Sequence, residues 1–217
     1  MLSKLHETWN MELETQNGQL SPHFALSEFT KSATAKKRGI ANVPSEQEIE
    51  NLRRLCQGTL EPLREALRLP IIITSGYRCK ALNNILGRSS KNSQHMAGCA
   101  ADFYVGQSPV QSSRIKATEL QNPISKMVSG FKSLVSSLVK SVTKAEKPAS
   151  HRELLIKAFR TIILDERIDY DQLILYPTFI HVSYVSRERN RRAILIGQRD
   201  GKLGYGRLSL KNALKIE

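Results

Sequence analysis

Long apolar runs are missing from this sequence. The first residues, MLSKLHETWNMELETQ, hold no apolar run of the about 7–15 residues that a secretory signal requires. No stretch approaches the roughly 20 apolar residues of a membrane-spanning helix. We therefore expect a soluble protein that is made in the cytoplasm without a signal peptide.

Cysteine is also scarce. The three cysteines, Cys56, Cys79 and Cys99, cannot all pair with one another, and none has the C-x-x-C spacing of a structural zinc site. A free cysteine behaves as a small buried hydrophobic residue. We interpret all three as reduced thiols that serve packing.

Acidic and aromatic residues are few. Lys and Arg number 33 against 20 Asp and Glu, which gives a net charge of +13 and a pI near 9.9. Such a charge attracts a polyanion: a nucleic acid, an anionic membrane or an anionic cell wall. Aromatic residues make up only 6% of the chain, the lysines are scattered, and no nucleic-acid reading motif is present. Nucleic acid is therefore the least favoured partner, and the sequence indicates no oligomeric state.

The apolar content is sufficient for one folded domain. Hydrophobic residues are 40% of the 217, enough for a substantial core, and no internal repeat is visible. Residues 1–21 are polar and are interpreted as an N-terminal arm, and residues 22–217 as the domain. A segment rich in Ser, Lys and Gln, residues 106–150, interrupts this domain as an insertion.

Periodic patterns predict both helices and strands. Ser45 and Glu48 form a helix-start signature ahead of leucines at helical spacing, which predicts a helix to Leu67 with a kink near Gly58 or Pro62. A β-branched run at 71–74 predicts a buried strand that ends at Ser75-Gly76 and delivers Tyr77 and Arg78 to a turn. The other predicted elements are a brief helix at 79–87, a strand at 100–105, a helix at 152–163 and a strand within 191–198.

Two strands near the C-terminal end, DQLILY and FIHVSY, are separated only by Pro177-Thr178. If these two residues are the hairpin loop, one side of the pair carries Tyr176 facing Phe179, Ile174 facing His181, and Gln172 facing Ser183. The other side carries Leu173, Leu175, Ile180 and Val182 and is predicted to face the core.

The stretch SQHMAGCAADF places His95 and Asp102 seven residues apart, with small residues between them. His181 alone is typical of a solvated or hydrogen-bonded histidine. Together, two histidines and a carboxylate offer the N, N, O donors that suit Zn²⁺, and three protein ligands leave a fourth position for water, as in catalytic sites. The small residues let a loop fold tightly from His95 to Asp102.

These residues resemble the zinc D-alanyl-D-alanine carboxypeptidases and related peptidoglycan endopeptidases. The family motif S-x-H-x-x-G-x-A-x-D is matched at Ser93, His95, Gly98, Ala100 and Asp102. The similarity extends to SGYRC, ALN, DQLI and HVSY, at 75–79, 81–83, 171–174 and 181–184, in the same order along the chain. It covers roughly residues 22–105 and 150–195.

The resemblance implies a fold, a cofactor and roles for single residues. It implies an α+β fold with helices packed on a small, mainly antiparallel sheet. His95, Asp102 and His181 would bind zinc. Arg78 would help to bind substrate and steady the oxyanion, and Ser93 and Gln94 would join it in substrate binding.

One departure from the family concerns the general base. The family supplies a glutamate near the end of the DQLI strand or a second histidine two residues before the zinc histidine, and Tyr176 and Phe179 occupy those places here. A phenol titrates near about 10 and is a poor base at neutral pH. Tyr176 is thus the candidate catalytic residue on the zinc side, while the parity of Asp171 predicts the opposite face. The base stays undetermined.

Two functions follow as hypotheses. The first is a zinc peptidase, a D,D-carboxypeptidase or endopeptidase, that cuts bonds of D-amino acids in the peptidoglycan stem peptide. It would be a bacteriophage endolysin that acts at the cell wall after release, or an enzyme carried in the virion. The second is a weakly active or inactive zinc-bearing module that binds the wall or belongs to the virion structure, in which Tyr176 marks loss of the base.

The insertion carries an amphipathic pattern over residues 122–143. Asn122 and Pro123 suit a helix start, nine apolar residues share one arc, and lysines with serines cover the rest. Residues 106–150 contain seven Lys and Arg against two Glu. The pattern fits a helix packed in the core, a helix at an anionic membrane interface, or a lid or partner surface over the site.

Overall fold

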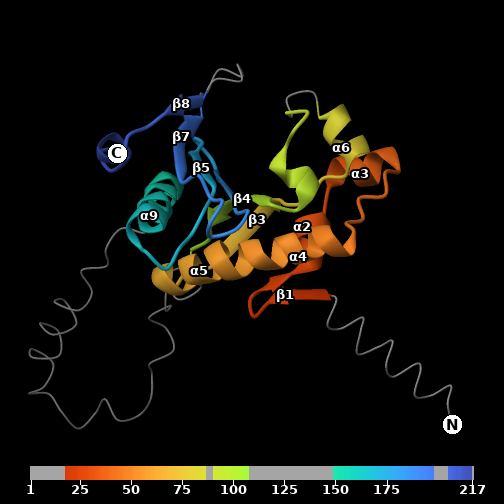
Figure 1. The fold of residues 1–217 in the computed structure, drawn as a ribbon, viewed down its shortest axis with the longest axis horizontal. Helices are drawn as coiled ribbons and strands as arrows, with labels where there is room; N and C mark the ends of the chain where they lie inside the picture. The colour runs from red at the N-terminus through yellow and green to blue at the C-terminus, as the bar shows by residue number, and fades with distance from the viewer. Residues whose placement is uncertain (1–17, 87–89, 108–148, 198–204, 217) are drawn as a thin grey trace, which may run out of the picture. The chain divides into compact units, whose positions relative to one another are not determined.

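The computed structural model describes residues 18–86, 90–107, 149–197 and 205–216 (Figure 1). Within them, six strands form a sheet in the order β3-β4-β6-β5-β7-β8. Only the β5–β7 pair is parallel, so the sheet is mainly antiparallel. The strands are β3 (Ile71–Ser75), β4 (Ala100–Val105), β5 (Gln172–Leu175), β6 (Ile180–Ser183), β7 (Ala193–Gly197) and β8 (Tyr205–Arg207). The predicted α+β class is confirmed.

Helices precede, connect and follow these strands. They are α2 (Leu26–Thr30), α3 (Ala33–Arg38), α4 (Glu46–Leu55), α5 (Glu61–Leu67), α6 (Lys80–Ile85), α9 (His151–Leu164) and α10 (Leu210–Ala213), with a 3-10 turn, η2, at Gln94–Ala97. Helix α9 packs on β4 and β5 and against α5 (Figure 1). The core between them contains large side chains that are fully buried, including Phe103, Phe159, Leu155, Ile162 and Leu63.

The hairpin of β5 and β6 has the predicted register. Gln172 pairs with Ser183 and Ile174 with His181. The Tyr176 amide donates to the Phe179 carbonyl at 3.0 Å, which closes the two-residue loop. The four residues predicted for the core side, Leu173, Leu175, Ile180 and Val182, are all buried.

The long helix predicted from Ser45 begins with the expected capping box. The Glu48 carboxylate accepts from the Ser45 amide at 2.6 Å and from its hydroxyl at 2.9 Å. Between α4 and α5 lies one π-helical turn, η1 (Cys56–Leu60), so the ribbon continues from α4 into α5 (Figure 1). The Gly58 carbonyl in this turn accepts from the Asp169 amide at 3.0 Å. The irregularity predicted near Gly58 is therefore a widened turn that contacts a distant segment.

The N-terminal part of the described chain packs beside β3. Strand β1 (Gln19–Ser21) pairs with β2 (Phe24–Ala25), and Leu20 is buried. Helix α2 follows, and its Phe29 packs so closely on Gly76 that a Cβ there would lie 2.6 Å from it. Glycine is therefore required at position 76, between the end of β3 and Arg78.

The sheet belongs to one compact unit, formed by the described residues up to Gly106 and from His151 onward. The predicted domain limits stay predictions, and the amphipathic pattern at 122–143 lies outside the described residues. No helix in the described ranges is long and apolar enough to cross a membrane.

Candidate metal centre

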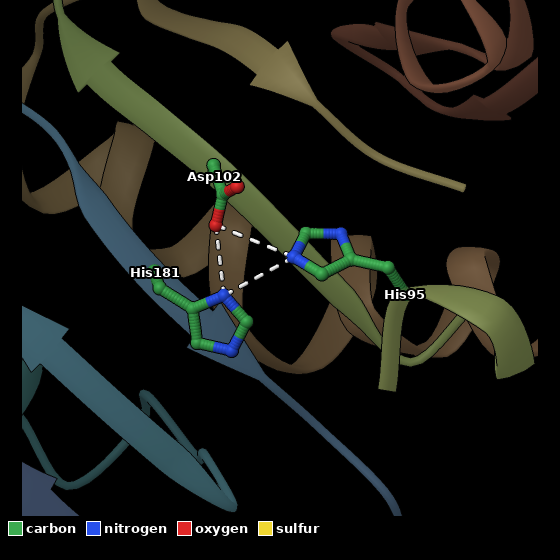
Figure 2. Close-up of side chains that lie close together, drawn as sticks. All are labelled: His95, Asp102 and His181. Carbon is green, nitrogen blue, oxygen red and sulfur yellow. Dashed lines mark hydrogen bonds and ion pairs between the residues drawn. The ribbon is translucent and has the colours of Figure 1, made fainter. Parts of the chain in front are cut away.

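The structure brings His95, Asp102 and His181 together, from η2, β4 and β6 (Figure 2). Asp102 and His181 are direct cross-strand partners. His181 Nδ1 lies 2.8 Å from Asp102 Oδ1 and 3.2 Å from His95 Nε2, and His95 Nε2 lies 3.4 Å from Asp102 Oδ1. In the part of the chain that the structure describes, this is the one group of three His, Cys, Asp or Glu side chains arranged to hold a metal ion.

The turn that carries His95 is held by its own backbone and by glycine. The Arg78 amide donates to the His95 carbonyl at 3.2 Å, which ties η2 to the turn after β3. Gly98 ends η2 with φ 68°, and a Cβ there would lie 2.3 Å from the Glu48 carbonyl oxygen. A side chain is thus disfavoured by both backbone conformation and space.

The side chain of His95 is fixed in one tautomer. Its Nδ1 lies 2.7 Å from the Gly76 carbonyl oxygen, and a carbonyl can only accept, so Nδ1 carries the proton. Burial lowers the pKa of His95, which favours the neutral ring. The lone pair of Nε2 therefore points into the cluster, as a metal ligand requires.

Asp102 is held in its charged form. Burial alone would raise the pKa of Asp102, but the hydrogen bond from His181 helps to lower it well below its usual range. A neutral imidazole and an ionised carboxylate are the protonation states that bind metal.

The geometry of the cluster fits zinc. Tetrahedral coordination with bonds of about 2.0–2.1 Å separates ligand atoms by about 3.3–3.4 Å. The two separations from His95 Nε2, 3.2 Å to His181 Nδ1 and 3.4 Å to Asp102 Oδ1, match this spacing, whereas His181 Nδ1 and Asp102 Oδ1, 2.8 Å apart, lie at hydrogen-bond distance. Without a metal, the single proton available to His181 Nδ1 would face two acceptors, His95 Nε2 and Asp102 Oδ1, which lie close together. The donor set and spacing fit a zinc site with three protein ligands.

The predicted substrate-binding residues adjoin this cluster. Arg78 Nη2 lies 3.3 Å from Ser93 Oγ, and the positive charge of Arg78 contributes to the lowered pKa of His95. Arg78 also lines a pocket of about 430 Å³ together with Ser75 and Lys31. The Gln94 amide instead donates to a carboxylate, Asp171 Oδ2, at 2.9 Å. The substrate roles of Arg78, Ser93 and Gln94 stay predictions.

Tyr176 packs on its neighbours at the end of β5. Its ring stacks on that of Phe179, with centroids 4.3 Å apart, and covers Gly197 of β7, where a Cβ would meet the ring at 2.3 Å. Tyr176 lies one residue beyond the end of β5 and two residues after Ile174, the cross-strand partner of His181. Its catalytic role stays a prediction.

The side chain of Asp171 does not follow the strand alternation that predicted it on the face opposite the zinc side. It precedes β5, its side chain is only 2% exposed, and its carboxylate lies 3.5 Å from the Ser183 hydroxyl as well as bonding Gln94. Arg191 donates to it through both backbone and side chain. Sequence reasoning missed this cluster, although the DQLI motif contains its central residue.

Comparison with known proteins gives one match. Residues 22–136, more than half of the chain, match the family model described as Peptidase M15. The matched range includes His95 and Asp102 and ends before His181. Searches of curated proteins and of solved structures found no match.

Proposed function

The chain belongs to the Peptidase M15 family, and on this basis we propose that it is a zinc-dependent peptidase that cuts bonds of D-amino acids in the peptidoglycan stem peptide. The observation that carries the proposal is the convergence of His95 Nε2, Asp102 Oδ1 and His181 Nδ1 within 3.4 Å of one another. Two of these ligands lie in the range that matches the family.

The residues of the chain have separate tasks in this proposal. His95, Asp102 and His181 hold the ion, and the Gly76 carbonyl fixes the ring of His95. Zinc held by these three residues would supply a more acidic bound water and a Lewis acid for the carbonyl of the scissile bond. Arg78 opposes the negative charge that develops on that carbonyl oxygen, and Ser93 orients its guanidinium.

The setting of the reaction is also part of the proposal. The net charge of +13 supports an anionic substrate such as the bacterial cell wall. We place the protein in bacteriophage lysis or in the virion, where it would reach peptidoglycan after release or on entry.

A second candidate function is a zinc-bearing module with weak or no activity that binds the wall or forms part of the virion. The packing of Tyr176 between Phe179 and Gly197 favours it, because an aromatic ring fills the place where the family has a base.

One experiment separates the two candidates. Purified protein is incubated with peptidoglycan, and released peptides are identified by mass spectrometry, with zinc content measured in parallel. The peptidase proposal expects peptide release that a chelator stops and added zinc restores, and loss of bound zinc in His181→Ala. A full equivalent of zinc without peptide release supports the second candidate. A full equivalent retained by His181→Ala after dialysis overturns the metal centre itself.

A further inference from the structure

A buried carboxylate lies next to the proposed metal centre without belonging to it. Asp171 Oδ2 accepts from Gln94 Nε2 at 2.9 Å, and Asp171 Oδ1 accepts from the amide and Nε of Arg191 at 2.9 and 2.8 Å. The Asp171 side chain is 2% exposed, whereas that of Arg191 is 60% exposed. We name Gln94, Asp171 and Arg191 the clamp.

The backbone of Asp171 is fixed in the sheet. Its amide donates to the Ser183 carbonyl at 2.7 Å, and its carbonyl accepts from the Ala193 amide at 2.9 Å. Ser183 lies two residues beyond His181 on β6. The backbone that carries the Asp171 carboxylate is therefore held by hydrogen bonds to β6, the strand of His181, and to β7.

The other end of the clamp holds the turn that carries His95. Gln94 is the neighbour of His95 and the first residue of η2. Three ties of this turn come from the side of β3 and α4. The Arg78 amide donates to the His95 carbonyl, His95 Nδ1 bonds the Gly76 carbonyl at 2.7 Å, and Asn51 Nδ2 on α4 donates to the Ala97 carbonyl at 2.8 Å. The Gln94–Asp171 bond joins η2 to the β5 and β6 side.

From this arrangement we infer that the clamp positions His95 against His181 and thereby sets the affinity of the site for its metal. The inference rests on the proposed metal centre. The His95 Nε2 to His181 Nδ1 separation of 3.2 Å is close to the spacing that zinc requires, and a shift of η2 away from the sheet would widen it. Gln94 is then a positioning residue, and its side-chain amide donates to Asp171.

The hydrogen bonds of the clamp are of a kind that can hold Gln94 in one position. Hydrogen bonds to an ionised carboxylate are shorter and stronger than neutral ones, and the buried carboxylate of Asp171 needs its partners. Loss of outer partners that orient metal ligands weakens metal binding by about 10–100-fold in known sites. We expect a loss in that range when the Gln94–Asp171 bond is replaced by repulsion.

The test uses Gln94→Glu, which sets a second carboxylate against Asp171. The full-length protein is titrated with Co²⁺ and with Zn²⁺ against a competing chelator, and the visible absorption of bound Co²⁺ reports ligand geometry. Gln94→Glu should bind about 10–100-fold more weakly, with an altered spectrum. The double variant Gln94→Glu/Asp171→Asn restores an amide–carboxylate pair with donor and acceptor exchanged, and should bind more tightly than Gln94→Glu. Gln57→Glu makes the same charge change at an exposed site and should bind like the wild type.

The outcomes separate this inference from the proposed function. A wild-type protein that binds neither ion refutes the metal centre. A wild-type protein that binds, with Gln94→Glu equally tight and spectrally unchanged, overturns the clamp alone, as does a double variant no tighter than the single one. If Gln94→Glu does not fold by circular dichroism, Gln94→Ala removes the same bond without adding charge. Gln94→Ala should still bind several-fold more weakly than the wild type, and equal binding overturns the clamp.

Discussion

Replacement of Gly98 by alanine should destabilise the protein and damage the metal centre together. Gly98 has φ 68°, and a Cβ added there would lie 2.3 Å from the Glu48 carbonyl oxygen and 3.1 Å from its Cα. The obstacle is backbone of α4, which cannot rotate away as a side chain would. The overlap between the added Cβ and the Glu48 backbone is therefore relieved only if η2 and α4 move apart.

The magnitude follows from two costs. The left-handed conformation costs a residue with a Cβ about 1–2 kcal/mol. Forcing an extra carbon into a packed site costs about 1–3 kcal/mol more. The total of about 2–5 kcal/mol is a large part of the about 5–15 kcal/mol that keeps a typical domain folded. At roughly 2–4 °C per kcal/mol for a chain of this size, Tm should fall by on the order of 10 °C.

Gly39 provides the matched control. It has φ 62° and no atom within 4 Å of an added Cβ, so Gly39→Ala bears the conformational cost alone, about 1–2 kcal/mol. Both variants are compared by urea unfolding and by zinc titration. Gly98→Ala should unfold at lower urea than Gly39→Ala and bind zinc more weakly, because the Gly98 amide bonds the His95 carbonyl at 3.3 Å. Equal unfolding midpoints for the two variants would refute the steric argument.

Three other changes test different parts of the molecule. Arg78→Ala should retain its zinc and lose about 10²-fold or more in turnover on peptidoglycan, as removal of one oxyanion partner does; unchanged turnover would exclude Arg78 from the reaction. Although burial opposes ionisation, hydrogen bonds from Arg191 and Gln94 hold the pKa of Asp171 at about 2. The ionised carboxylate therefore stabilises the folded protein above pH 3.8, the usual pKa of Asp, and this contribution is lost as the pH falls toward 2. The free energy of unfolding in urea should fall for the wild type between about pH 5 and 2, and it should fall by on the order of 1–2 kcal/mol less for Asp171→Asn. Parallel curves for the two proteins would contradict this. Deletion of residues 108–148 should preserve folding and zinc binding while it lowers binding to anionic vesicles; an insoluble product would place that segment in the core.

The hairpin was predictable because its information is local. A two-residue loop at Pro177-Thr178 fixes the register of the strands on either side, and alternation then assigns each side chain to a face. The structure confirms Ile174 opposite His181. The approach of His181 to Asp102 is different, since 79 positions separate them and no periodicity relates β4 to β6. That contact was expected from the donor chemistry of the three residues and from the resemblance to a family.

The features missed from the sequence depend on distant partners. The π-helical turn at Cys56–Leu60 exists where the Gly58 carbonyl bonds the Asp169 amide, more than 100 positions away. The position of Asp171 was misjudged because alternation holds only inside a strand, and Asp171 stands just before β5, where its carboxylate is free to turn toward Gln94. Propensity and period describe the inside of an element. They do not describe its ends.

Binding of a metal and its use in catalysis are separable in this fold. The three candidate ligands come from η2, β4 and β6, so none of them depends on a side chain of β5. Tyr176, at the end of β5, instead contacts Phe179 and covers Gly197, and an aromatic ring over a glycine of the next strand is a stabilising arrangement in sheets. Selection for strand packing at position 176 can therefore proceed without disturbing the metal ligands. For this reason zinc content alone does not distinguish a peptidase from a zinc-bearing module, and peptide release must be measured beside it.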